Sequence, residues 1–232
     1  MQKILVTGGD GRFATELKKI KTKYNFIYLS KKQLNILSLN SIRKNIKRLK
    51  PKIILHLAGL SRPMSIHNTN INKSIDLNII GTANLVKTCN EHKIKIIFFS
   101  TNYVYPGTKG NYSENDPVLP WNNYGWSKLG AESAVQMYKN SLIIRACMTE
   151  KPFIHKFAFS DVRSNFIFHE DFAKIFFKII KKKGVINIGG QTRSIYAFAK
   201  RYNKKVKKKK SKGELPKKMH MNLKKLKKYL NK

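Results

Sequence analysis

Short apolar runs alternate with stretches of helical periodicity along the first 150 residues, and this alternation restricts the fold more than any other feature. The runs predict strands at residues 3–7, 25–29, 52–56, 94–100 and 141–145. The segments between them carry apolar residues at helical spacing, at residues 12–21, 76–92 and 122–138 and in a helix that begins at Ser38 or Asn40 and ends before Pro51. Repeated strand–helix units predict an α/β protein whose parallel sheet is covered by helices on both faces.

After residue 150 the alternation becomes less regular. The remaining pattern predicts a short strand at 165–168, a helix at 169–182, a strand at 184–188 and a short helix at 194–202. Residues 204–212 are mostly lysine and predict a basic linker. Met219, Leu223, Leu226 and Leu230 have helical spacing, which predicts a terminal helix that packs back on the chain.

The chain is strongly basic, with 48 Lys and Arg against 12 Asp and Glu in 232 residues and a formal net charge of +36. Residues 200–232 carry +15 of this charge, and the other +21 is spread over the rest of the chain. Only 8 of the basic residues are Arg, the residue that base-reading sites favour. Nucleic-acid binding is therefore open but not favoured, whereas attraction of small anions such as nucleotides is expected.

Composition and pattern exclude several classes of protein. A hydrophobic content of 41% allows a full core and rules out general disorder. The first apolar run turns at Thr7–Gly9, too early for a signal peptide, and no run is long enough to span a membrane. Cys89 and Cys147 lack CxxC spacing, and the six histidines lack metal-ligand spacing, so we predict no disulfide and no metal site. We expect a cytoplasmic protein with no membrane partner.

A glycine-rich turn, TGGDGRFA at residues 7–14, follows the first strand and opens the first helix. Gly8 permits a tight turn, Gly11 allows the backbone to approach a pyrophosphate, and the small Ala14 allows close packing of helix on strand. The phosphates of a dinucleotide are expected at the positive end of the helix. A glycine pattern alone is weak evidence, and its position between a strand and a helix strengthens it.

Two further groups of residues suggest carbonyl chemistry. Tyr124 and Lys128 are four positions apart in a predicted helix and project from one face. An ammonium group beside a phenol is expected to lower the phenol pKa and make the tyrosine a proton donor or acceptor. Ser100 and Thr101 end a strand, where side chains face the ligand crevice of an open α/β sheet.

The order of these motifs resembles that of the extended short-chain dehydrogenase/reductase family, in particular its sugar-nucleotide branch of dTDP-4-dehydrorhamnose reductase-like proteins. The segments that carry the resemblance are TGGDGRFA (7–14), HLAG (56–59), LNIIGTANL (77–85), STNYVYPG (100–107), YGWSKLGAE (124–132), FIFHEDFA (166–173) and, more faintly, NIGG (187–190). The resemblance covers roughly residues 1–200.

The resemblance implies a Rossmann-type doubly wound sheet with a small C-terminal substrate lobe. It implies an NAD(P)-binding domain at 1–150 that includes the YxxxK motif, a reduced substrate-binding lobe at 151–203, and the basic linker and terminal helix at 204–232. The catalytic set would be Thr101, Tyr124 and Lys128. The cofactor-binding residues would be Gly8, Asp10, Gly11, Arg12, Phe13, Ser30, Lys31, Asn35, Ile36, Leu57, Ala58, Gly59, Asn78, Tyr124 and Lys128.

The expected reaction is NAD(P)H-dependent reduction of a keto group, at position 4, on a nucleotide-linked deoxysugar, as in polysaccharide biosynthesis. Two alternatives are a nucleotide-sugar 4-epimerase that retains NAD tightly and a non-catalytic RNA-binding or scaffold protein of the same fold. A homodimer is compatible with each.

Some residues depart from the family pattern. Asn102 stands where the reductases commonly have Asp, and the segment between Arg145 and FIFHEDFA is shorter than usual. The second strand ends without an acidic residue and is followed by Lys31 and Lys32, which favours NADPH over NADH. Arg145 is interpreted as a salt-bridge residue, although it could reach a substrate diphosphate.

Overall fold

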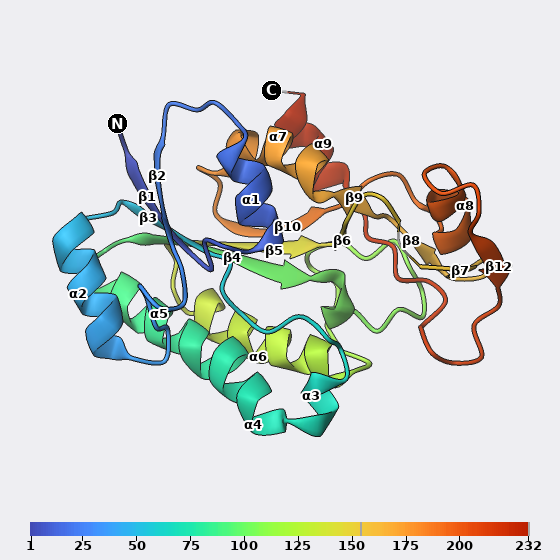
Figure 1. The fold of residues 1–232 in the computed structure, drawn as a ribbon, viewed down its shortest axis with the longest axis horizontal. Helices are drawn as coiled ribbons and strands as arrows, with labels where there is room; N and C mark the ends of the chain where they lie inside the picture. Colours follow the sequence, from blue (N-terminus) through green and yellow to red (C-terminus); the bar gives the residue numbers. More distant parts are fainter. Residues whose placement is uncertain (154, 232) are drawn as a thin grey trace.

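A parallel six-stranded sheet forms the centre of the protein in this computed structural model, which describes residues 1–153 and 155–231 (Figure 1). Its strand order is β10-β5-β4-β3-β1-β2. The strands are β1 (Lys3–Thr7), β2 (Asn25–Leu29), β3 (Ile53–His56), β4 (Lys95–Thr101), β5 (Ser141–Ala146) and β10 (Gly184–Ile188). The strand order reverses at β1, because β2 lies on one side of it and β3 on the other. Such a reversal leaves a crevice at the carboxyl end of the sheet.

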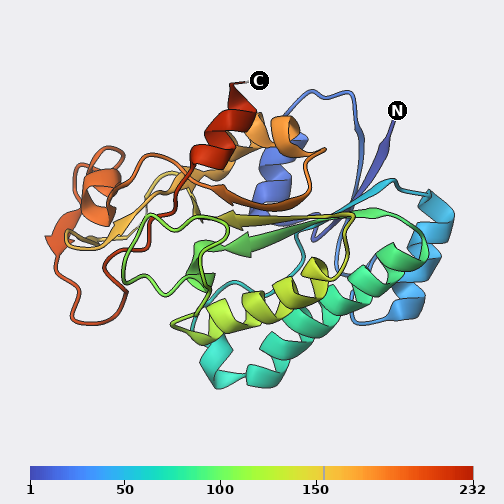
Figure 2. The same cartoon turned by 180° about the vertical axis from the view of Figure 1, so that it is seen from behind.

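Helices cover both faces of this sheet, as the sequence predicts. One face carries α1 (Arg12–Lys18), α7 (His169–Ile179) and α9 (Lys224–Leu230), and the other carries α2 (Leu39–Leu49), α5 (Gly81–Glu91) and α6 (Asn123–Gln136) (Figures 1 and 2). No helix of the described residues is long and apolar enough to cross a membrane.

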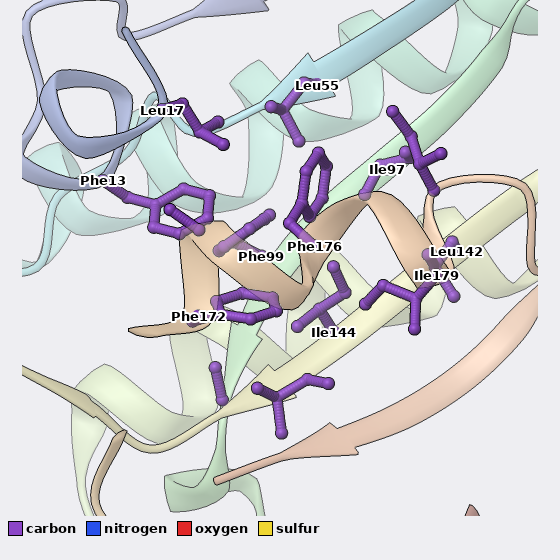
Figure 3. Close-up of a cluster of buried hydrophobic side chains, with 14 of the residues drawn as sticks. Phe13, Leu17, Leu55, Ile97, Phe99, Leu142, Ile144, Phe172, Phe176 and Ile179 are labelled. Carbon is purple, nitrogen blue, oxygen red and sulfur yellow. The ribbon is translucent and has the colours of Figure 1, made fainter. Parts of the chain in front are cut away.

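Alternation along each strand divides the apolar side chains between two cores. In β4, Ile97 and Phe99 face α1 and α7, while Ile96 and Phe98 face the other helices. Figure 3 shows the first core, in which Phe172 and Phe176 of α7 pack against Phe13 and the strand residues. Both faces are buried, which is why the strands read as nearly continuous apolar runs.

A small lobe lies beside the carboxyl end of the sheet (Figure 1). It contains β6 (Met148–Thr149), β7 (Phe157–Phe159), β8 (Arg163–Ser164), β9 (Ile167–Phe168), β11 (Arg193–Ser194), α8 (Ile195–Lys200) and β12 (Lys207–Lys209). These strands form three two-stranded sheets, β6 with β9, β7 with β12 and β8 with β11. Part of the predicted basic linker is therefore a strand.

Other boundaries differ from the sequence expectations. The terminal helix begins at Lys224 rather than Met219, because Met219 and Met221 are buried in an extended segment that hydrogen-bonds to neighbouring strands and loops. The helix predicted at 76–92 begins as a π-helix, η1 (Ile75–Ile80). It is preceded by two single turns, α3 (Ile66–Thr69) and α4 (Ile71–Ser74), and a 3₁₀ turn, η2 (Asn102–Val104), follows β4.

We call the sheet with its six covering helices the body. The elements α7, β10 and α9 come from the second half of the chain and complete the body. The division of the chain at about residue 150 into cofactor-binding and substrate-binding parts stays a prediction.

Candidate active site

The glycine turn after β1 is held tightly between two strands. Gly8 has φ +66°, and a Cβ on it would lie 2.7 Å from the backbone nitrogen of Ala58. Gly9, which the sequence analysis did not single out, donates its N–H to the Leu29 carbonyl at 2.9 Å and has no room for a Cβ either. Gly11 caps the N-terminus of α1 and donates to the Gly8 carbonyl at 2.9 Å. The turn therefore requires glycine at positions 8 and 9.

A cavity of about 210 Å³ opens beside this turn at the carboxyl end of the sheet. It brings together eight residues that were predicted to bind the cofactor, which are Gly11, Arg12, Phe13, Leu57, Ala58, Gly59, Tyr124 and Lys128. Its other lining residues are Ala14, Leu60, Ser61, Phe99, Ser100, Met148 and His169.

A second cavity of about 230 Å³ continues from the first. The two share Arg12, Ser61, Ser100, Tyr124, Met148 and His169, and the second adds Thr101. The predicted catalytic residues therefore border one continuous cleft, although they come from β4 and α6.

Tyr124 and Lys128 project from the first turns of α6, where the Asn122 side chain caps the helix by accepting from the Gly125 N–H at 2.8 Å. Lys128 is buried, with its Nζ 4.1 Å from the centre of the Phe98 ring. Burial lowers the pKa of Lys128 to about 7, against the opposing charge of Glu132. Among the described residues, its ammonium group has no hydrogen-bond partner, so it is available to a ligand in the cleft.

The predicted lowering of the Tyr124 pKa is wrong. Burial raises the pKa of Tyr124 to about 12, although a hydrogen bond with Thr101 and the charges of Arg12 and Arg62 act in the opposite direction. Lys128 is not among the groups that shift this pKa, and its ammonium lies over the Phe98 ring. The phenol is consequently protonated at neutral pH and able to donate a proton.

Ser100 and Thr101, at the end of β4, line the cleft. Thr101 is buried, and its hydroxyl accepts from the Tyr103 N–H at 3.3 Å. The Ser100 hydroxyl is buried without a hydrogen-bond partner among the described residues. Thr101 lines the cleft beside Tyr124, so its hydroxyl can bind a carbonyl oxygen.

Asn78 acts through the loop rather than in the cleft. Its amide accepts from the Leu60 N–H at 2.7 Å and donates to the Leu60 carbonyl at 2.9 Å and to the Ser127 hydroxyl at 2.8 Å. It does not line either cavity. The π-helix η1 carries Asn78 to this position, where it fixes the loop that forms one wall of the site.

The other predicted cofactor-binding residues lie outside the two cavities. Ile36 is buried against Gly81, and Asn35 accepts from the Leu37 N–H at 3.1 Å. The residues not brought into the cavity lining are Gly8, Asp10, Ser30, Lys31, Asn35, Ile36 and Asn78. Ser30 and Lys31 directly follow Leu29, whose carbonyl accepts from the glycine turn. The role predicted for these two residues toward an adenosine stays a prediction.

Several residues in the cleft carried no sequence signal. Met148, Ser61 and Arg62 come from segments without a recognisable pattern, and His169 lies in the FIFHEDFA segment but was not predicted as a site residue. Arg145 pairs with Glu132 at 2.7 Å in the interior, which confirms its interpretation as a salt-bridge residue. Asn102 is buried and donates to the Met219 carbonyl at 3.3 Å, so it is used in the fold.

The chain is similar to several known proteins. A family model described as the RmlD substrate binding domain matches residues 1–149. A dTDP-4-dehydrorhamnose reductase from Aggregatibacter actinomycetemcomitans is 25% identical over 204 residues, covering 84% of this chain and 64% of that protein. The spore coat polysaccharide biosynthesis protein SpsK of Bacillus subtilis is 33% identical over 150 residues, covering 62% of this chain and 52% of that protein. Methionine adenosyltransferase 2 subunit beta of Pongo abelii is 34% identical over 103 residues, with 44% and 30% covered.

Solved structures confirm the predicted fold. A dTDP-4-dehydrorhamnose reductase from Bacillus anthracis, solved with NADP, superposes with a TM-score of 0.87 at 20% identity and covers 100% of this chain and 92% of that one. The UDP-Glc/GlcNAc 4-epimerase from Campylobacter jejuni superposes with a TM-score of 0.78 at 18% identity, with 99% and 93% covered. The chain thus spans the fold of these enzymes, but only about a third to two thirds of the curated relatives that it matches.

Proposed function

The chain belongs to the RmlD substrate-binding domain family, and from this membership we propose that it is an NAD(P)H-dependent reductase of a keto group on a nucleotide-linked deoxysugar. The observation that carries the proposal is the single cleft that joins the glycine turn to Thr101, Tyr124 and Lys128. The relatives and the solved structures named above support it.

The residues of the cleft fit a nicotinamide dinucleotide. The start of α1, from Gly11 to Ala14, lines the cavity, so a pyrophosphate would lie beside the N-terminus of this helix. The ammonium of Lys128, which lines the cavity, suits ribose hydroxyls. The absence of an acidic residue after β2 favours NADPH. When bound, the dihydronicotinamide would supply a hydride to the substrate carbonyl carbon.

The chain's own groups would handle the oxygen and its proton. Thr101 would hold the carbonyl oxygen beside Tyr124, whose phenol would donate the proton as negative charge develops. The raised pKa of Tyr124 keeps it protonated at neutral pH, as reduction requires. Lys128, which lines the same cavity as Tyr124, would bind ribose.

A third cavity, of about 530 Å³, supports a nucleotide-linked substrate. It adjoins the cleft through Arg62, Tyr103, Met148 and Phe166. The small lobe contributes apolar and basic side chains to its wall, which are Phe153, His155, Lys156, Phe157, Phe159 and Lys209. Aromatic rings suit a base, and cations suit a diphosphate. The reduced lobe therefore retains room for a nucleotide sugar.

The test is NADPH oxidation by the purified chain with a panel of nucleotide-linked 4-keto sugars. Tyr124→Phe should lower kcat by at least about 100-fold, since general-acid catalysis contributes on that scale, and leave the NADPH Kd nearly unchanged. Tyr229→Phe, on the remote helix α9, is the matched control and should keep full activity.

Other results would decide for the alternatives. Equal activity of Tyr124→Phe and the unaltered chain would refute the mechanism. Sugar isomerisation without net NADPH consumption, with cofactor that survives purification, would indicate an epimerase. Absence of NADPH binding together with strongly salt-dependent RNA binding would indicate a non-catalytic protein.

A further inference from the structure

One carboxylate spans two arginines at the mouth of the cleft. Oε1 of Glu150 accepts from Nη1 of Arg12 and, at 2.9 Å, from Nη1 of Arg62. Arg12 begins α1, Arg62 lies in the loop after β3, and Glu150 directly follows β6. The contact therefore joins the glycine turn, the loop at the cleft wall and the start of the small lobe.

The three groups approach the cleft from different sides. Arg12 lines both cavities of the cleft. Arg62 lines the second of these, of about 230 Å³, and also the third cavity, of about 530 Å³, which we call the outer cavity. Glu150 lines none of these and lies instead in a neighbouring hollow of about 250 Å³ that Arg12 also lines. Its carboxylate thus neutralises two cations that face the ligand space, without facing that space itself.

The contact is easy to exchange for another anion. The side chains of Arg12, Arg62 and Glu150 are 43%, 48% and 33% exposed. Ion pairs as exposed as these favour association by about fivefold at most. A diphosphate carries more charge than a carboxylate and offers several oxygens to a guanidinium fork, so it should displace Glu150. The charges of both arginines act on Glu150 together, lowering its pKa although partial burial opposes them.

We propose that Arg12 and Arg62 form a diphosphate-binding subsite and that Glu150 is its internal competitor, which occupies both guanidinium groups until a ligand diphosphate displaces it. This inference rests on the proposed function for the identity of the ligand. A dinucleotide and a nucleotide sugar share the diphosphate chemistry. Arg12 lies beside the glycine turn, where the diphosphate of a dinucleotide would contact it more than Arg62. Arg62 lines the outer cavity, where the diphosphate of a nucleotide sugar would contact it more than Arg12.

The experiment is calorimetric titration of the full chain with inorganic pyrophosphate, NADPH and thymidine diphosphate at low salt. Glu150→Gln should bind pyrophosphate about tenfold more tightly than the unaltered chain, because two exposed ion pairs no longer compete. Glu170→Gln is the matched control. Glu170 lines the same hollow as Glu150, but it pairs with Lys151 and with neither arginine. It should bind pyrophosphate like the unaltered chain.

Two further variants identify the source of the diphosphate. If the dinucleotide uses the subsite, Arg12→Gln should weaken NADPH binding more than thymidine diphosphate binding. If the nucleotide sugar uses it, Arg62→Gln should show the reverse. In the Arg12→Gln, Arg62→Gln double variant, adding Glu150→Gln should give no gain.

The outcomes separate this inference from the proposed function. Unchanged or weaker pyrophosphate binding by Glu150→Gln, or an equal gain in Glu170→Gln, would overturn the competitor role. Tighter pyrophosphate binding without any NADPH binding would support the competitor and count against the reductase. NADPH binding in a chain whose affinities for NADPH and for thymidine diphosphate are both unchanged by Glu150→Gln would support the reductase and count against the competitor.

Discussion

The body and the small lobe differ in the length of their strands and in the size of their apolar cores. Strands of the body have four to seven residues and are apolar on both faces, whereas lobe strands have two or three residues. The lobe core is a small cluster around Phe153, Val162 and Ile195. The candidate catalytic groups lie on β4 and α6 of the body, and the lobe supplies most of the outer cavity. A large core thus fixes the candidate catalytic groups, while a small appended cluster shapes the cavity proposed for the substrate.

The two regions should differ most in how much free energy of unfolding is lost when a core phenylalanine is replaced by alanine. Phe176→Ala should lower the free energy of unfolding by about 4 kcal/mol, because the dense core around Phe176 cannot collapse into the cavity. Phe153→Ala, in the lobe, should cost about 1–2 kcal/mol, because fewer groups surround it and they can relax. Urea denaturation measures both. Equal costs would show that the lobe is as tightly packed as the body.

A buried ion pair should give the next largest effect. The side chains of Glu132 and Arg145 are 1% and 4% exposed, and Arg145 also donates to the Tyr105 hydroxyl at 2.9 Å. Glu132→Gln should cost about 3 kcal/mol, because it leaves a buried guanidinium without its counter-charge. The control is Glu91→Gln, which breaks an exposed pair with Arg43 and should cost less than about 1 kcal/mol. Similar losses in the two variants would contradict the importance of burial here.

The sequence predicts the body well because its strands and helices are long enough to show a period. The bounds of β2 and β10 agree with the predictions residue for residue. No period can appear in a two-residue strand, so the pairing of Met148 with Ile167 in the lobe has no sequence signal.

The candidate site also contains residues that the sequence predicts and residues that it does not. Tyr124 and Lys128 follow from their spacing on one helix, and Gly8 from its place after β1. Arg62 and Glu150 meet only through tertiary folding, so their sequence positions give no indication of contact. The pKa of Tyr124 was predicted with the wrong sign, because burial outweighs the neighbouring charges and is not visible in a motif.

Glycine substitutions give a smaller and more local comparison. Gly8→Ala should cost about 2 kcal/mol, because it combines a positive φ with a contact to the Ala58 backbone, and it should also weaken NADPH binding. Gly213 in the lobe also has a positive φ, of +106°, but its Cβ would meet nothing within 4 Å. Gly213→Ala should therefore show the backbone cost alone and retain NADPH binding. Thermal unfolding and NADPH titration test the pair, and loss of binding in both variants would refute a specific role for the turn.

The smallest expected effect is a pH dependence at Lys128. Burial lowers the pKa of Lys128 to about 7 from an ordinary value of 10.5. Between these values the unfolded chain binds a proton that the folded chain has released, so stability rises with pH in that window. Below about pH 7 both states hold the proton and the cost of burying the charge is present in full. Lys128→Met removes this cost, and its stability advantage should be largest below pH 7.

Two stability measurements, at pH 7 and pH 8, test this assignment. The advantage of Lys128→Met over the unaltered chain should shrink by about 1 kcal/mol across that unit, below the limit of about 1.4 kcal/mol for one proton. Lys208→Met, at an exposed lysine of the lobe, removes the same charge without relieving any burial, so its curve should run parallel to that of the unaltered chain. Parallel curves for Lys128→Met as well would mean that its ammonium is solvated in the cleft. Lys128 would then be able to hold a ribose only in competition with water, which would weaken the role proposed for it.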